Sequence, residues 1–114
     1  MAIKMILANV SCADLAVSLP WYETLFGMSP TRRPMEGLAE WHFTDSAEVQ
    51  LFESQANAGH CTLTLSVDAL EPERHRLTTQ GLRPGPIEST KDFVLTRLAD
   101  PDGNLVVLVS TERG

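Results

Sequence analysis

Few side chains in this sequence could do chemistry, and they are spread thinly along it. The imidazoles are His42, His60 and His75, and the thiols are Cys12 and Cys61. No serine or cysteine stands in a recognisable arrangement with a histidine and an acid, so no activated nucleophile is predicted. His75 lies among charged residues of a predicted helix, where an exposed face is its expected setting. His60 is the remaining acid–base candidate, against the alternative that it only hydrogen-bonds a neighbour at a strand edge.

Composition and charge narrow the possible partners. The chain has 114 residues, 43% of them hydrophobic, which is enough for one core but short for two independently stable domains. Its net charge of −6 argues against nucleic acids and anionic membranes. The apolar run over residues 1–7 is too short to span a bilayer and makes a poor signal peptide. We therefore predict a cytoplasmic protein that binds small molecules or proteins, with Cys12 and Cys61 as buried free thiols.

One order of elements occurs twice along the chain. A strand-like run precedes a helical stretch at residues 14–27, and a second run precedes another at 68–81, with the same spacing from Asp to Gly. Three more strand-like runs follow each helix, and a turn precedes the last of them at residues 44–47 and 100–104. The repeat predicts a strand, a helix and three strands, written twice.

The helix ends carry ordinary capping signals. Asp14 and Asp68 are predicted N-caps, and Gly27 and Gly81 suit the left-handed residue after a helix. Pro20 lacks the amide that a helix interior needs, so the regular part of the first helix is predicted to start near Ser18.

Alternation along the strands separates an apolar face from a mixed one. In three strands the mixed face has the composition of a ligand cleft or an interface, while the opposite face is apolar enough to lie under a helix. These mixed faces comprise Met5, Leu7, Asn9 and Ser11; Glu48, Gln50 and Phe52; and His60, Thr62, Thr64 and Ser66. The facing of the strands around Trp41 and Leu95 stays open.

Three segments, in this order, resemble one known family. They are Val10-Ser-Cys-Ala-Asp14-Leu15, Trp21-Tyr22-Glu-Thr-Leu25-Phe-Gly27 and Asp100-Pro-Asp-Gly-Asn104-Leu105. Together they resemble the vicinal oxygen chelate superfamily, which includes glyoxalase I, the bleomycin and fosfomycin resistance proteins and the extradiol dioxygenases.

The resemblance implies an α+β fold in which two βαβββ modules form a curled mixed sheet with helices on the outer face. It implies one domain over residues 1–114, with module one at 1–57 and module two at 58–114. It further implies a homodimer whose clefts take strands from both subunits.

Metal-dependent members of that family place ligands at corresponding points of the two modules. Counting from the motifs, those positions carry Leu7, Gln50, His60 and Val107 in this sequence. Leu7 and Val107 offer no donor atom, a neutral Gln50 amide is a weak donor, and His60 alone cannot hold a divalent cation. We therefore expect neither a metal nor another cofactor.

The favoured function is a metal-free small-molecule-binding protein, like the bleomycin resistance proteins, that sequesters a hydrophobic or aromatic compound. The predicted ligand-binding residues are His60, Gln50, Trp41, Phe52, Leu7 and Val107. Two alternatives stay open. One is an enzyme, either a metal-dependent lyase or dioxygenase or a catalyst that uses His60 as acid or base; the other is a structural or interaction module.

For several further residues the sequence does not decide between contact with a ligand and a structural role. For Trp21, Trp41 and His42 core or dimer packing is an equal alternative to stacking on a planar ligand. Arg32 and Arg33 could attract an anionic ligand, but paired arginines on an edge strand are usually solvated.

The ligand-position argument leads to a first prediction. Wild-type protein should purify without stoichiometric metal even when Ni²⁺ or Zn²⁺ is supplied, because two of the four positions have no donor. The double substitution Leu7→His with Val107→Glu should add two donors to His60 and give stabilisation by Zn²⁺ or Mn²⁺, measured by elemental analysis and thermal unfolding. Stoichiometric metal in the wild type would overturn the prediction.

Overall fold

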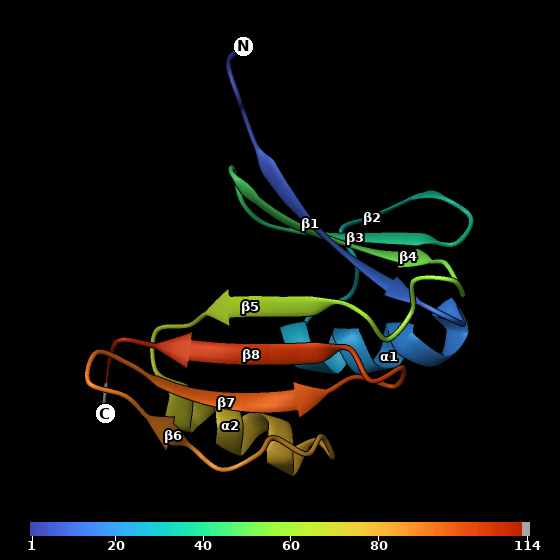
Figure 1. Cartoon of the computed structure of the whole chain (residues 1–114). Helices are drawn as coiled ribbons and strands as arrows, with labels where there is room; N and C mark the ends of the chain where they lie inside the picture. The colour runs from blue at the N-terminus through green and yellow to red at the C-terminus, as the bar shows by residue number, and fades with distance from the viewer. Residues whose placement is uncertain (113–114) are drawn as a thin grey trace.

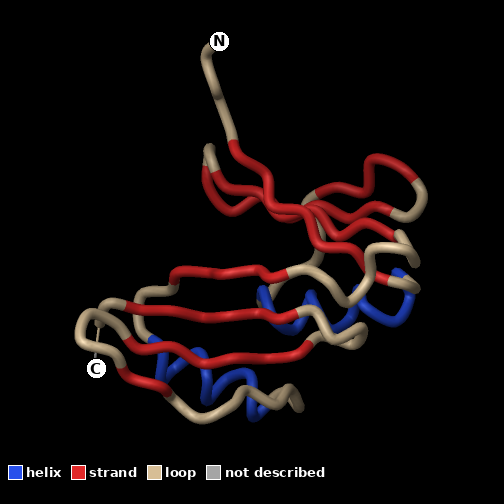
Figure 2. Tube along the Cα trace, in the orientation of Figure 1, coloured by secondary structure: helices blue, strands red, loops and turns tan. Residues whose placement is uncertain are grey.

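The computed structural model describes residues 1–112, and within them the chain forms two helices and eight strands (Figures 1 and 2). In chain order these are β1 (Ile6–Cys12), α1 (Leu15–Phe26), β2 (Arg32–Met35), β3 (Leu38–Thr44), β4 (Ala47–Glu53), β5 (Thr62–Ser66), α2 (Leu70–Thr79), β6 (Glu88–Ser89), β7 (Val94–Ala99) and β8 (Leu105–Ser110). No helix among these elements is long and apolar enough to cross a membrane.

The strands form two open sheets with the same topology. The order is β1-β4-β3-β2 in the first sheet and β5-β8-β7-β6 in the second. In each, the strand before the helix pairs in parallel with the last strand of its module, and the remaining pairs are antiparallel. The predicted α+β fold of two βαβββ modules is therefore confirmed, with a four-stranded mixed sheet in each module.

The predicted turns and strand faces are also borne out. The turn at Asp100 to Asn104 connects β7 to β8, and the turn after Thr44 connects β3 to β4. In β5, Leu63 is buried while Thr62 and Thr64 on either side of it are exposed. The helix-facing side is the fully buried one.

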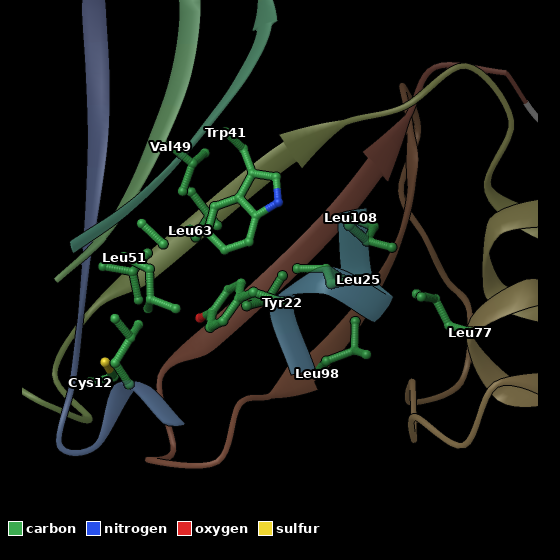
Figure 3. Packing of buried hydrophobic residues seen from close by; sticks show 14 of the residues in the cluster. Cys12, Tyr22, Leu25, Trp41, Val49, Leu51, Leu63, Leu77, Leu98 and Leu108 are labelled. Atoms are coloured by element: carbon green, nitrogen blue, oxygen red, sulfur yellow. The ribbon is translucent and has the colours of Figure 1, made fainter. Parts of the chain in front are cut away.

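A single hydrophobic cluster lies between the sheets and the helices. Tyr22 of α1 and Trp41 of β3 are both 0% exposed, and their ring centroids lie 6.4 Å apart. Figure 3 shows these rings pointing toward Leu63 of β5, with Leu51 of β4 beside them. The helix α1 thus shares one core with both modules, and its apolar stripe of Leu15, Tyr22 and Leu25 is buried against the sheets.

The turn between β7 and β8 also connects the two modules by buried hydrogen bonds. The Oδ2 atom of Asp100, a residue only 5% exposed, accepts bonds from the Tyr22 hydroxyl at 2.6 Å and from Asn104 Nδ2 at 2.8 Å. The same amide group of Asn104 donates to the Ser11 carbonyl at 2.8 Å. Asp102 accepts from the Ser18 hydroxyl at 3.2 Å. The sequence Asp-Pro-Asp-Gly-Asn therefore holds the first module as well as turning the chain.

A second connection runs from α2 to the end of α1. The Arg76 guanidinium donates to the carbonyls of Thr24 and Leu25 at 2.8 and 2.7 Å. These carbonyls belong to the last turn of α1, where no later helical amide can reach them. Gly27, at φ 70°, ends that helix in the left-handed conformation, as predicted.

Two expectations about the helices were wrong. Asp14 caps α1 through a bond from the Ala16 amide, but the residue before α2 is Ala69, which has no side-chain cap. Asp68 lies one residue too early, and its carbonyl accepts the Ser110 hydroxyl instead. The helix α1 begins at Leu15 and continues through Pro20. Pro20 removes only the amide that would reach the exposed Ala16, and burial of the stripe outweighs that loss.

The buried turn predicts the effect of removing one hydroxyl. Tyr22→Phe should lower the free energy of unfolding by about 1–3 kcal/mol, because the Asp100 carboxylate stays buried with one donor fewer. Urea unfolding measures the change. Thr24→Val is the matched control, since it removes an exposed hydroxyl bond to the Pro20 carbonyl; an equal loss in both variants would contradict the argument.

The two cysteines differ in burial, and this difference predicts which thiol reacts in the folded protein. Both cysteines are free, as predicted; Cys12 is buried and Cys61 half-buried. Burial, together with the nearby Asp102 and Glu53 charges, raises the pKa of Cys12 to about 11.

At neutral pH Cys12 is therefore the unreactive thiol form. Iodoacetamide should label it only in unfolded protein, while Cys61 should be labelled in the native state. Mass spectrometry of labelled peptides tests this, and native labelling of Cys12 as fast as Cys61 would contradict it.

Candidate functional site

The face of the first sheet opposite α1 carries a cluster of polar side chains. Alternation puts Trp41 and Val49 on the helix side of β3 and β4, so Glu40 and His42 share the other face with Glu48 and Gln50. The strand register places Glu40 opposite Gln50 and His42 opposite Glu48. We call this set, together with Arg32 of β2, the sheet-one cluster.

Its hydrogen bonds form one connected network. Nη2 of Arg32 lies 2.9 Å from Glu40 Oε1 and 3.1 Å from Glu48 Oε1. His42 Nδ1 lies 2.9 Å from the same Glu48 oxygen. Gln50 Nε2 donates to Glu40 Oε2 at 2.5 Å. Each of the two glutamates therefore has at least two polar partners.

The cluster carries more negative than positive charge. The Glu40 and Glu48 side chains are 8% and 5% exposed, whereas Arg32 is 61% exposed. Two carboxylates face one guanidinium, leaving one negative charge while His42 is neutral. Buried carboxylates are costly unless they are paired, so this face favours a further positive group.

A groove of about 530 Å³ opens beside the cluster. Its walls are both apolar and charged: Met5, Leu7, Thr31, Arg32, His42 and Glu48. Pockets that bind small molecules combine apolar walls with a few polar groups in this way.

The structure brings some of the predicted site residues together and separates others. Leu7, 42% exposed, lines the groove, and Gln50 and Phe52 follow on the same face of β4. Val107 lies in the second sheet, opposite Arg97 of β7.

The two remaining candidates lie elsewhere. His60 is exposed in the loop before β5. Trp41 lies in the core, 0% exposed, with its indole donating to the Met28 carbonyl at 2.9 Å. The open question about the strand around Trp41 is thus answered: its ring faces the helix, while Glu40 and His42 face the groove.

The whole architecture is shared with proteins of known structure. A glyoxalase/bleomycin resistance protein from Catenulispora acidiphila is 26% identical, with a TM-score of 0.87 over 93% of this chain and 96% of that one. A bleomycin-binding protein complexed with bleomycin has the same fold at 20% identity, with a TM-score of 0.78 over 96% of this chain and 100% of that one. So does lactoylglutathione lyase from Agrobacterium tumefaciens, at 14% identity and a TM-score of 0.78 over 93% and 92% of the two chains. No family model and no curated protein matches the sequence.

These structures bear out the resemblance of the three motifs. The chain has the fold of the glyoxalase/bleomycin resistance proteins, consistent with the vicinal oxygen chelate superfamily.

The metal that the resemblance suggests does not fit the residues present. Leu7 and Val107, at positions that the resemblance assigns to metal ligands, offer no donor atom, and the Gln50 amide already bonds Glu40 and Asn9. Within residues 1–112 no three histidine, cysteine or acidic side chains are placed to hold a metal ion. Polar groups of this face bind one another instead.

Sequence reasoning missed Glu40, placed Glu48 on the mixed face without giving it a role, and favoured a solvated Arg32 over one that contacts a ligand. The missing signal was the apolar alternation of Ala39, Trp41 and Phe43, which puts Glu40 and His42 on the opposite face. With Glu40 on that face, Arg32 of the neighbouring edge strand β2 contacts both carboxylates.

The cluster predicts unequal roles for two adjacent arginines. Arg32→Ala should lower the free energy of unfolding by about 1–2 kcal/mol, less than for a fully buried pair because the arginine is partly solvated. Arg33→Ala, which removes only an exposed bond to the Leu38 carbonyl, should cost less than about 0.5 kcal/mol. Urea unfolding at neutral pH compares them, and equal losses would contradict the role given to the cluster.

Proposed function

We propose that this protein is a metal-free binding protein that sequesters a hydrophobic or aromatic compound carrying a basic group. The observation that carries the proposal is the groove beside Leu7, where apolar walls meet the buried Glu48 carboxylate, which shares Arg32 with Glu40. A protonated amine would supply the missing positive charge, and an aromatic ring would cover Met5 and Leu7, with Phe52 further along the same face of β4. The bleomycin-binding protein of the same fold makes such a role plausible for this architecture.

We further propose a two-fold homodimer. In one chain Leu7 and Gln50 belong to the first sheet and Val107 to the second, so a partner's second sheet could complete the cleft. Large apolar side chains are exposed on and beside β1, Ile6 at 75% and Ile3 at 71%. Such exposed apolar surface is typical of an interface. In the dimer His60 would approach the ligand from the loop before β5.

The cellular compartment and the domain organisation are part of the same proposal. Two free thiols suit a reducing compartment, which supports the cytoplasm. We take residues 1–114 as one domain, with modules at 1–57 and 58–114.

An enzymatic role is the second candidate, because a lactoylglutathione lyase has the same fold. A metal-dependent lyase or dioxygenase requires stoichiometric metal in the active protein. Elemental analysis therefore separates it from the proposed binding function.

Assembly is tested by sedimentation. At micromolar concentration the protein should sediment as a dimer, because two-fold pairing buries the exposed apolar side chains. A monomer would overturn this part of the proposal.

Binding is tested with a matched pair of probes. 1-Naphthylmethylamine should bind at least about tenfold more tightly than 1-naphthoic acid, because the ammonium meets the surplus carboxylate charge and the naphthoate is repelled. Isothermal titration measures both affinities, and equal or reversed affinities would contradict the proposal.

Two exposed apolar side chains on different faces provide the control. Leu7→Ala should weaken binding of the amine by about 1–2 kcal/mol through loss of apolar contact in the groove. Phe43, similarly exposed but on the helix-facing side of β3, should be replaceable by Ala without effect on affinity. The earlier candidate Trp41 cannot serve here, because its replacement would disturb the core.

A further inference from the structure

The contact between His42 and Glu48 fixes which nitrogen of the imidazole can accept a proton. A carboxylate only accepts hydrogen bonds, so His42 Nδ1, 2.9 Å from Glu48 Oε1, carries the donor hydrogen. In the neutral ring the lone pair then lies on Nε2. No other residue within 1–112 hydrogen-bonds Nε2.

Burial differs sharply between the two partners. The Glu48 side chain is 5% exposed and is held by Arg32 as well, whereas the His42 side chain is 38% exposed and lines the groove. A buried, fixed carboxylate behind an accessible imidazole is the arrangement that orients a general base. The other histidines lack it, since His60 and His75 are exposed and neither has an acidic partner among the described residues.

The charged groups around His42 come from its own strand and from the two strands beside it. Glu48 lies on β4, Glu40 on β3 itself, and Arg32 on β2. Two carboxylates and one guanidinium therefore lie around the imidazole. Only Nη2 of Arg32 contacts the glutamates, which leaves its other N–H groups free to donate to an oxygen in the groove.

We propose that His42 and Glu48 form a metal-free acid–base pair that adds water to carbonyl compounds, with His42 as the catalytic base and Glu48 as its positioning residue. The inference rests on the groove of the proposed binding function. The acid–base role that the sequence suggested for His60 is thus assigned to His42, whose ring is oriented by Glu48.

For an ester the step balances without a cofactor. His42 Nε2 removes a proton from water while the water oxygen bonds to the carbonyl carbon, and the carbonyl oxygen becomes an oxyanion that the free Arg32 N–H groups can bind. The tetrahedral intermediate then collapses and the C–O bond to the leaving group breaks. The leaving oxygen takes the proton back from Nε2, giving an acid and an alcohol.

Hydrolysis of 4-nitrophenyl acetate tests the pair, with the uncatalysed rate subtracted. His42→Gln should lower kcat/KM at least about tenfold, because a positioned general base typically contributes about a hundredfold or more. His75→Gln is the matched control: His75 is exposed on α2, outside the groove, so this variant should keep the wild-type value.

The role of Glu48 has its own control in the second glutamate. Glu48→Gln should lower kcat with little change in KM, and NMR should show that the Nδ1–H tautomer of His42 is no longer favoured. Glu40→Gln, which does not contact His42, should leave the tautomer unchanged. Circular dichroism establishes that each variant folds; if Glu48→Gln does not, the His42→Gln result decides.

Two results would overturn the inference: wild-type kcat/KM in His42→Gln, or an equal loss in His75→Gln. Titration of 1-naphthylmethylamine separates this from the binding proposal. Amine binding without His42-dependent hydrolysis removes only the acid–base pair, whereas hydrolysis without amine binding removes only the sequestering function.

Discussion

The carboxylate of Asp100 is the group on which the arrangement of this molecule depends. It is buried, and it accepts hydrogen bonds from the Tyr22 hydroxyl, the Asn104 side chain and the backbone amides of Asp102 and Asn104. A buried charge is tolerable only while such donors are in place. Because Tyr22 belongs to α1 and the other donors to the turn before β8, the carboxylate is satisfied only when the two modules are docked. Burial also raises the pKa of the Tyr22 hydroxyl, with the bond to Asp100 adding to the effect, so this donor keeps its proton.

Local features of the sequence predicted most of the fold, because each had a local cause. The turn at residues 100–104, the cap at Asp14 and the alternation in β4 and β5 depend on neighbours close in sequence. Asp68 failed as a cap because Ser110, far along the chain, bonds its carbonyl. Pro20 did not delay α1, because burial in a core made by both modules outweighs one missing bond. Both errors arose from tertiary contacts that a sequence pattern does not contain.

The candidate site was less predictable, for the same reason. The family resemblance identified Leu7 and Gln50 at the groove face, but it also suggested Trp41, which lies in the core. The sheet-one cluster depends on the register of three strands, since Glu48 meets both His42 and Arg32 only when β2, β3 and β4 are aligned. In this chain Arg32 neutralises part of the acidic charge on that face. Unlike a bound ion, an arginine side chain cannot dissociate, so the positive charge on this face is always present.

The bond from Arg76 to the end of α1 has a consequence for the history of the repeat. The two halves of the sequence share one order of elements, yet the guanidinium lies in one half and its carbonyl acceptors in the other. An ancestral half-length chain with the same contacts would have had to find these partners on a second copy of itself. Fusing two copies makes the partner permanently available and lets each half lose what the other supplies. Symmetry can then decay, which is how one half could keep a charged groove while the other kept the turn that holds them together.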